Sequence, residues 1–341
     1  MSFRVLRPGV LATVQDLGRR GLQHLGIVAG GAMDPISHRL ANALVGNGVG
    51  AATLELALTG PELLIGRDAL VALHGARFAA EVDGVPFPQS RPVLVRAGAR
   101  LRIGRVTAGC FGYLAVAGGL QVDPVLGSRS TYLAGRFGGW RGRVLERGAE
   151  VPFAADMETL AAERFGRIGA RHRAIPLGPC KTVRWLAPGV TLPEHGESVI
   201  RTLAGLHAVL FDETARDLLH GARWRIAPDS NRMGFRLLGP RLALARPVEI
   251  VSQPVCLGTV QVPPAGQPIV LMADHQTTGG YPRIAEVIAA DMPRLAQLGP
   301  GATLRFAEAT LAEADAARET LGTRVDQLVE RILWEFGDEG D

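Results

Sequence analysis

Lysine is almost absent from this 341-residue chain: Lys181 is the only one, and every other basic residue except histidine is an arginine. A phosphate-binding P-loop needs a lysine directly after a glycine, whereas Lys181 follows Cys180, so no such loop is present. Lys181 is also the only position for a Schiff base or for biotin attachment, and its neighbours resemble neither site. The arginines are scattered and form no basic stripe, so we expect no nucleic-acid partner.

Cysteine is equally scarce, with Cys110, Cys180 and Cys256 isolated from one another and odd in number. This spacing argues against disulfides and zinc sites and favours a reducing, cytoplasmic location. We expect no signal peptide, no membrane association and no metal, because no apolar run reaches membrane-spanning length and no HExxH or EF-hand pattern occurs. The GxSxG turn of many serine hydrolases is missing as well.

Aromatic residues make up 5% of the chain, while it contains 43 glycines and 22 prolines. Short Val, Leu and Ile runs between these glycines and prolines predict a mainly β fold with some helix. Predicted strands of the first half cover residues 3–14, 52–60, 62–65, 70–73, 78–82, 93–95, 100–103 and 112–116. Those of the second half cover residues 182–186, 222–226, 248–252, 257–263 and 268–272. This regular spacing is typical of a barrel or a sandwich.

The chain length predicts about two domains. We expect an N-terminal β-barrel unit over residues 1–152, a connector over 153–180, a C-terminal barrel unit over 181–308 and a C-terminal helix over 309–341. Short internal echoes, such as residues 97–102 with 300–305, suggest that the two barrel units are related. A helix is predicted at 35–45, with Asp34 as its N-cap. Residues 204–211 and 213–219 are further helix candidates.

The most informative stretch is Ala273-Asp274-His275-Gln276-Thr277-Thr278-Gly279-Gly280-Tyr281-Pro282. It follows the predicted strand 268–272 and precedes residues 283–292, whose apolar spacing predicts a helix. An acid, an imidazole, an amide and hydroxyls would then meet beside a glycine pair at a helix start, where backbone N–H groups can hold an anion. The alternative is an ordinary polar corner in solvent.

Several other polar residues stand out in the first half. Glu55 lies among apolar neighbours in a predicted strand, so its carboxylate must pair, most simply with an arginine, or stay protonated. The repeated glycines and hydroxyls of the two neighbouring loops 118–131 and 138–143 could cradle an anion, although they form no GxGxxG pattern. The additional candidate site residues are Gln15, Asp16, Asp34, Glu55, Ser128 and Thr131.

Ordered motifs along residues 4–308 resemble one known family. They are Val14-Gln15-Asp16-Leu17-Gly18-Arg19, Gly31-Ala32-Met33-Asp34, Ala41-Asn42-Ala43-Leu44-Val45-Gly46-Asn47, Leu54-Glu55, Gly60-Pro61, Gly127-Ser128-Arg129-Ser130-Thr131, Ser230-Asn231-Arg232-Met233-Gly234, Gln261-Val262-Pro263 and Gln276-Thr277-Thr278-Gly279-Gly280-Tyr281-Pro282. The chain resembles the allophanate hydrolase subunit 2 family. That family is also named after the C subunit of 5-oxoprolinase or after the biotin-dependent carboxyltransferases, and it includes the antagonist of the Kip sporulation inhibitor.

The resemblance implies a cyclophilin-like β-barrel architecture, with two such units here, and a smaller partner, the B subunit or Kip-inhibitor-like protein. One implied function is ATP-dependent opening of the 5-oxoproline lactam to glutamate, together with a third partner, the A subunit of 5-oxoprolinase. The second is the carboxyltransferase step of a urea or amide carboxylase, with biotin carried by another chain. The third is non-enzymatic binding of a Kip-inhibitor-like protein. The chain itself shows no readable ATP site, and a homo-oligomer stays open.

All these substrates contain a planar amide, whose chemistry needs donors for the carbonyl oxygen and an acceptor for a proton. We therefore assign catalytic roles to Asp274, His275 and Tyr281, and substrate binding to Asn231, Arg232, Gln261, Gln276, Thr277, Gly279 and Gly280. Structural alternatives remain for each. Asn231 could cap a turn, Arg232 could pair with Glu249, His275 could bond a backbone carbonyl, and Gln261 could fill the barrel interior.

Overall fold

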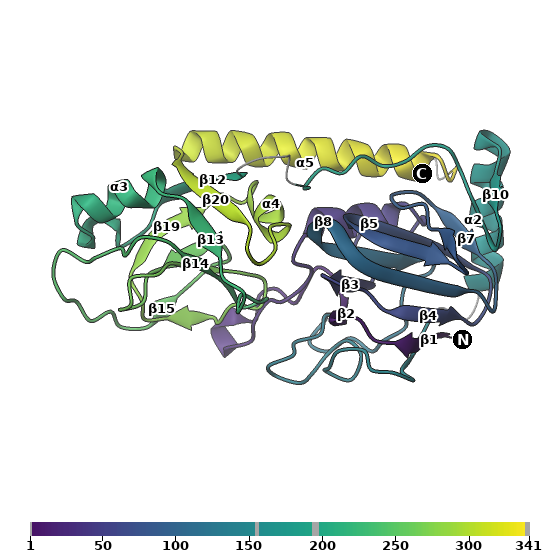
Figure 1. Ribbon diagram of the computed structural model, residues 1–341, viewed down its shortest axis with the longest axis horizontal. Helices are drawn as coiled ribbons and strands as arrows, with labels where there is room; N and C mark the ends of the chain where they lie inside the picture. The colour runs from purple at the N-terminus through teal and green to yellow at the C-terminus, as the bar shows by residue number, and fades with distance from the viewer. Residues whose placement is uncertain (1, 154–156, 193–197, 338–341) are drawn as a thin grey trace. The chain divides into compact units, whose positions relative to one another are not determined.

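The computed structural model describes residues 2–153, 157–192 and 198–337. The chain forms two compact units, neither of them continuous in sequence. The first unit takes residues 1–18, 34–192 and 323–341, and the second takes residues 19–33 and 193–322. Figure 1 labels many of their helices and strands.

The first unit is built on one 11-stranded sheet with the order β10-β11-β7-β5-β8-β4-β1-β9, in which β2 pairs with β3, β3 with β8, and β6 with β5. Its strands are β1 (Ser2–Arg7), β2 (Leu11–Gln15), β3 (Thr53–Ala57), β4 (Glu62–Ile65), β5 (Ala69–Val82), β6 (Val85–Pro86), β7 (Val93–Val95), β8 (Arg100–Val116), β9 (Glu150–Pro152), β10 (Ile175–Leu177) and β11 (Cys180–Thr182). The pairs are antiparallel, so short turns suffice to connect many of these strands.

Strands β5 and β8 are longer than the sequence pattern indicates. Each joins two predicted strands, and the two pair with each other from Val71–Val116 to Val82–Leu101. The register shifts between Gly75 and Ala80, so the sheet absorbs the local irregularity without ending either strand. Strand β11, which spans the predicted boundary between the connector and the C-terminal barrel unit, pairs with β7 and therefore belongs to this sheet.

Two helices of the first unit contact β5, namely α1 (Pro35–Ala43) and α2 (Met157–His172). The helix predicted at residues 35–45 is confirmed. Asp34 is its N-cap, with its carboxylate accepting the N–H groups of Ile36 and Ser37. Pro35 occupies the first helical position, where its missing N–H costs nothing.

The second unit is a closed barrel of seven strands in the order β12-β19-β16-β17-β14-β13-β20. These strands are β12 (Ser198–Ala204), β13 (Trp224–Ile226), β14 (Gly234–Leu238), β16 (Thr259–Gln261), β17 (Ile269–Leu271), β19 (Arg283–Val287) and β20 (Thr303–Glu308). Strands β15 (Gln253–Pro254) and β18 (Thr278–Gly279) form a separate pair. The helical elements are η1 (Gln23–Leu25), η2 (Ala208–Leu210), α3 (Glu213–Gly221) and α4 (Met292–Ala296). Closure leaves no open sheet edge, and the core includes Trp224, Val260, Val270 and Leu304.

The predicted helix at residues 283–292 is wrong. Residues 283–287 form β19, paired with both β12 and β16, and helix begins only at Met292. Ile284 and Val287 are buried, and β-branched residues suit a strand that the barrel already flanks on both sides. The pattern of short apolar spacing could not separate the two structures.

Two smaller predictions in this unit also need correction. Residues 248–252 form no strand, and pairing begins at β15. Residues 204–211 contribute only the 3₁₀ turn η2, whereas the helix predicted at 213–219 is confirmed by α3.

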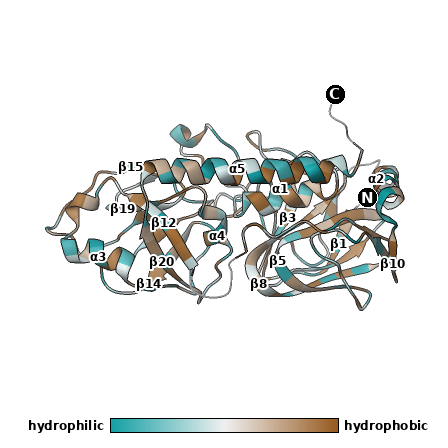
Figure 2. Ribbon diagram, turned by 90° about the horizontal axis from the view of Figure 1, so that it is seen from above, coloured by the Kyte–Doolittle hydropathy of each residue, from teal (hydrophilic) through white to brown (hydrophobic). Residues whose placement is uncertain are grey.

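The predicted C-terminal helix is confirmed as α5 (Leu311–Trp334), whose residues beyond Gly322 count in the first unit. Hydrophilic and hydrophobic residues alternate along it in Figure 2. Its buried apolar side chains include Val325, Val329 and Ile332, spaced as expected for one helical face. Among the residues that the structure describes, no helix is long and apolar enough to cross a membrane.

Candidate functional site

A buried ion pair anchors the segment that the sequence singled out. The Asp274 carboxylate accepts two hydrogen bonds from the Arg232 guanidinium, from Nε to Oδ2 and from Nη2 to Oδ1, both at 2.8 Å. The Arg232 Nη2 also donates to the carbonyl of Gly31 at 2.6 Å. Both ionic side chains are only 5% exposed, so they hold each other in place. Arg232 therefore pairs with Asp274, which corrects the suggested pairing with Glu249.

His275 follows directly and is also buried. Its Nδ1 lies 2.6 Å from the carbonyl oxygen of Gln276. Because a carbonyl can only accept, Nδ1 carries the proton and Nε2 keeps its lone pair. Burial lowers the pKa of His275, although the Gln276 carbonyl and the charge of Asp274 oppose that effect. The imidazole is thus neutral near pH 7, with Nε2 able to accept a proton.

Gln261 of β16 and Gln276 form a hydrogen-bonded pair of glutamines, and Gln261 lies next to Gly279. The Gln276 Nε2 donates to the Gln261 Oε1 at 3.3 Å, and the Gln261 side chain is 2% exposed. The Gln261 Nε2 has no hydrogen-bond partner in the described part of the chain. A Cβ added at Gly279 would lie 2.4 Å from that Nε2, so only glycine permits this approach.

The remaining members of the segment differ in exposure. Asn231 accepts the N–H of Met233 through its Oδ1 at 2.8 Å, which is the turn-capping role given as its alternative. The Thr277 carbonyl accepts the N–H of Val255 at 3.1 Å. Tyr281 is 46% exposed, and Gly280 is exposed beside the Ile250 carbonyl. The structure thus joins Arg232, Gln261 and residues 274–279 and leaves Asn231 and Tyr281 at the surface.

The donors available near this segment do not include a helix N-terminus. Since β19 replaces the predicted helix, any donors to a carbonyl oxygen come from side-chain amides and loop N–H groups. The Gly280 N–H donates to no acceptor among the described residues. The neutral imidazole supplies a proton acceptor, and the ion pair fixes the segment that carries it.

One further group, buried Arg19, was missed by the sequence reasoning. An added Cβ at Gly30 would lie 3.4 Å from the Arg19 Nη1 and 3.5 Å from the Asp274 Oδ1, so these two charged groups approach the same glycine. The only signal in the sequence was the glycine pair Gly30-Gly31, whose φ angles are 63° and 92°.

The additional candidates of the first unit form two buried polar clusters. In the first, the Asp16 carboxylate accepts the hydroxyls of Ser128 at 2.6 Å and Ser130 at 2.5 Å, and the backbone N–H of Arg129 at 2.5 Å. Burial by itself would raise the pKa of Asp16, but these hydrogen bonds outweigh it and lower the pKa. The Gln15 amide donates to the Thr131 carbonyl at 3.2 Å. The cluster ties the loop 128–131 to β2.

In the second cluster, Asp34 accepts hydroxyls from Ser37 and Thr191, each at 2.6 Å, in addition to capping α1. Tyr113 accepts the Asp34 N–H and donates to Glu55 at 2.8 Å. Burial, and then the charges of Glu55 and Asp34, raise the pKa of Tyr113, so it stays a hydroxyl donor. The sequence reasoning proposed an arginine for Glu55 and overlooked this tyrosine.

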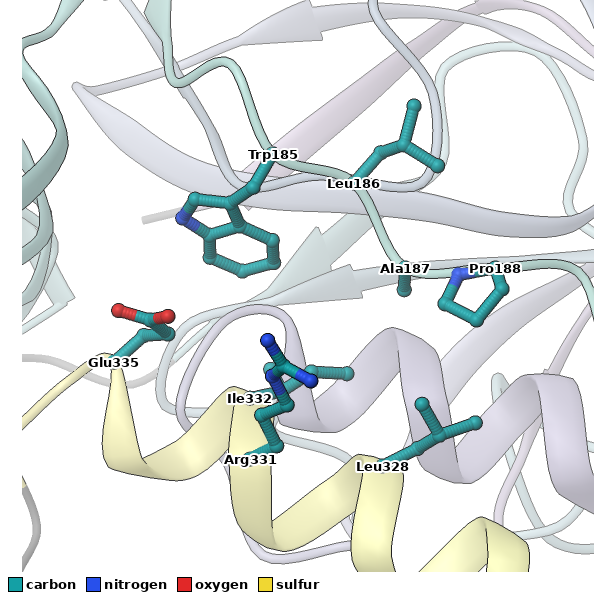
Figure 3. A pocket seen from close by; sticks show the side chains of 8 residues that line it. All are labelled: Trp185, Leu186, Ala187, Pro188, Leu328, Arg331, Ile332 and Glu335. Atoms are coloured by element: carbon teal, nitrogen blue, oxygen red, sulfur yellow. The ribbon is translucent and has the colours of Figure 1, made fainter.

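The first unit also contains a hollow of about 290 Å³, which none of these candidate residues lines. It is bounded by residues 185–188 and the last turns of α5, where Trp185, Leu328 and Ile332 provide apolar walls and Arg331 lies between them (Figure 3). No predicted site residue lines it.

Comparison with known proteins gives a consistent result. Residues 25–308 match the family described as carboxyltransferase domain, subdomain A and B. The C subunit of the Escherichia coli K12 5-oxoprolinase is 38% identical over 97% of this chain and 98% of its own length. The protein of the same name from Haemophilus influenzae is 37% identical over 93% of this chain and 94% of its own length.

A solved structure agrees with the sequence relatives. The urea amidolyase of K. lactis superimposes with a TM-score of 0.83 at 30% identity, over 96% of this chain but 20% of that protein. The sequence motifs, the barrel and these matches lead to one assignment. The chain belongs to the carboxyltransferase domain family, subdomains A and B, which the sequence motifs indicated.

Proposed function

We propose that this protein is the C subunit of a cytoplasmic, ATP-dependent 5-oxoprolinase, a hydrolase of cyclic amides that acts with a smaller B subunit and a third, A subunit. The observation that carries the proposal is the match to two 5-oxoprolinase C subunits along nearly the whole of both chains. The K. lactis urea amidolyase shares the fold, but the matched segment is only a fifth of that protein.

The residues of segment 274–281 suit the opening of a lactam. In that reaction water adds to the carbonyl carbon, the ring C–N bond breaks, and the nitrogen leaves as an amine after gaining a proton. His275 accepts a proton through Nε2, consistent with its protonated Nδ1. Gln261, Gln276 and the N–H of Gly280 orient the amide and the oxygen that gains charge.

The geometry favours His275 over Asp274 as the proton acceptor. The Asp274 carboxylate already accepts two hydrogen bonds from Arg232, and protonating it would leave that guanidinium without its counter-charge. Asp274 and Arg232 therefore position the segment. Tyr281, exposed at its end, is a candidate donor to a bound substrate.

ATP supplies the free energy for ring opening in this proposal. Because Lys181 on β11 is the only lysine, most of the groups in this chain that could contact phosphate are arginines, hydroxyls and backbone N–H groups. Biotin enters only in the carboxyltransferase alternative and would be carried by another chain.

The test is reconstitution with the A and B subunits, measuring ATP hydrolysis and glutamate release from 5-oxoproline. We expect both to require this chain and to fall at least a hundredfold with His275→Gln. His24→Gln is the matched control, since His24 lies exposed on η1 in the same unit. Glutamate release without this chain, or urea-dependent carboxylation with a biotin carrier, would contradict the proposal. Tight binding of the smaller partner without any turnover would favour the non-enzymatic alternative.

A further inference from the structure

A cleft of about 600 Å³ in the first unit is lined by two segments, 121–125 and 136–142, together with Pro152. It contains the glycine-rich stretch that the sequence marked as a possible anion cradle. None of the candidate residues described above lines it. Its size lies in the range of small-molecule sites rather than of a single bound ion.

The loop that forms one wall is tightly packed. Tyr132 and Phe137 exchange two backbone hydrogen bonds, and their rings meet edge to face at 5.5 Å. A Cβ at Gly139 would lie 1.8 Å from the Thr131 Oγ1, and one at Gly142 would lie 2.1 Å from the Arg136 carbonyl carbon. Only glycine therefore fits at these two positions of the loop.

That path holds two arginines in an uncommon conformation. Arg136 and Arg141 each have a φ of 54°, in the left-handed region that residues with a Cβ rarely adopt. Both residues belong to the lining of the cleft, and neither forms an ion pair within residues 2–153, 157–192 and 198–337. The Arg141 guanidinium lies over the Trp140 ring at 4.8 Å.

Backbone donors complete the wall. Gly138, Gly139 and Trp140 line the cleft, and their N–H groups donate to no acceptor in the part of the chain that the structure describes. Gly138 is buried, and a buried residue with an unused N–H is rare in folded proteins. Three consecutive N–H groups without an acceptor and two guanidiniums without an ion pair, all in the lining of one cleft, suit an anion with several oxygens such as phosphate.

The lining residues from segment 121–125 restrict which phosphate compounds the cleft can bind. Gln121 and Asp123 also line the cleft. A carboxylate repels bare phosphate, but it accepts hydrogen bonds from sugar hydroxyls, and the Trp140 and Phe137 rings provide apolar area for a base. We propose that this cleft binds a nucleoside phosphate, with its phosphates on Arg136, Arg141 and the 138–140 N–H groups and its ribose toward Asp123.

This inference deepens the proposed function if the nucleotide is the ATP of that reaction, but its test does not depend on turnover. Titration calorimetry on the full chain would measure binding of ATP, AMP, adenosine and pyrophosphate. The variant Arg136→Gln/Arg141→Gln removes both cations. The matched control is Arg143→Gln, because Arg143 is on the same loop, outside the cleft, and only 3.9 Å from exposed Glu146.

We expect ATP to bind at least tenfold more tightly than pyrophosphate, and adenosine to bind more weakly than AMP. The double variant should weaken ATP binding by tenfold or more, since each lost guanidinium removes charge-assisted hydrogen bonds, while Arg143→Gln changes it less than twofold. Circular dichroism and the unfolding midpoint check that the variants fold. Asp123→Asn, an exposed change, should independently strengthen pyrophosphate binding and weaken the preference for ATP.

Three results would overturn the inference. They are no binding of ATP at millimolar concentration, equal binding of ATP and pyrophosphate, and ATP binding that the double variant leaves unchanged. If the double variant lost nucleotide binding but kept glutamate release, the proposed function would stand. If the chain bound ATP but reconstitution gave no glutamate release, that function would be removed while this site would remain.

Discussion

Removing one partner of the Arg232–Asp274 pair should destabilise the barrel strongly. Both side chains are 5% exposed, and two hydrogen bonds of 2.8 Å join them. Asp274→Asn keeps the shape of the side chain but removes the counter-charge that Asp274 supplies to the buried guanidinium. Breaking a buried pair in this way costs about 3–5 kcal/mol, whereas exposed pairs contribute about 0–1 kcal/mol.

The chain offers a matched control for this change. Arg236 and Asp229 also form an ion pair in the second unit, at 3.2 Å, but their side chains are 57% and 68% exposed. Asp229→Asn should therefore alter the free energy of unfolding of the barrel by less than about 1 kcal/mol. The double variant Arg232→Met/Asp274→Leu, which removes both charges, should recover most of the loss caused by Asp274→Asn.

Hydrogen exchange measured peptide by peptide is the suitable assay, since a chain with two units does not unfold as one two-state system. Protection of β14 and β17, which flank the pair in sequence, should fall about a hundredfold or more in Asp274→Asn, given roughly tenfold per 1.4 kcal/mol. If Asp274→Asn lowered the free energy of unfolding no more than Asp229→Asn does, the Arg232–Asp274 ion pair would not be formed in solution. The positioning role of Asp274 would then be wrong.

Three other predictions concern the site and the first unit. Because burial lowers the pKa of His275, the acid limb of kcat/KM should lie below pH 6.5 and disappear in His275→Gln; a limb above 6.5 would contradict the neutral imidazole. Gly279→Ala would place a Cβ 2.4 Å from the Gln261 Nε2, so activity should fall at least tenfold, while Gly221→Ala, with open space at its Cβ, should leave it unchanged. Burial lowers the pKa of His38 to about 4, so the folded state binds fewer protons than the unfolded state between pH 6.5 and 4. The stability of the first unit, complete above pH 6.5, should thus fall by up to about 1.4 kcal/mol per pH unit, measured by hydrogen exchange in α1, and less in His38→Gln.

Capping residues, turn residues and apolar periodicity predicted the helices and strands whose structure depends mainly on neighbouring residues in the sequence. Asp34 before Pro35 indicated a helix start, and the cap hydrogen bonds to residues 36 and 37 are there. The short strands 62–65 and 93–95 are bounded by turns in the sequence, and β4 and β7 have those bounds. The stripe of apolar residues after 309 predicted α5 for the same reason, since its period matches a helix.

Long-range pairing determined what the sequence could not show. Residues 283–287 have a spacing that fits helix or strand, and only their neighbours β12 and β16 decide for the strand. Arg232 and Asp274 are 42 positions apart, so nothing local distinguishes Asp274 from Glu249 as the partner. Glu55 and Tyr113 likewise meet only because β3 pairs with β8.

These pairings also explain why the predicted catalytic residues separate into different roles. An acid that must remain charged to neutralise a buried guanidinium cannot also take up a proton at low cost, because protonation would remove the negative charge that Asp274 places against Arg232. A buried imidazole with its Nδ1 held by a backbone carbonyl has the opposite property, since both its neutral form and its free Nε2 are favoured. In the proposed mechanism Asp274 therefore positions the segment and His275 transfers the proton, and an activity loss in Asp274→Asn should scale with the loss of protection in β17.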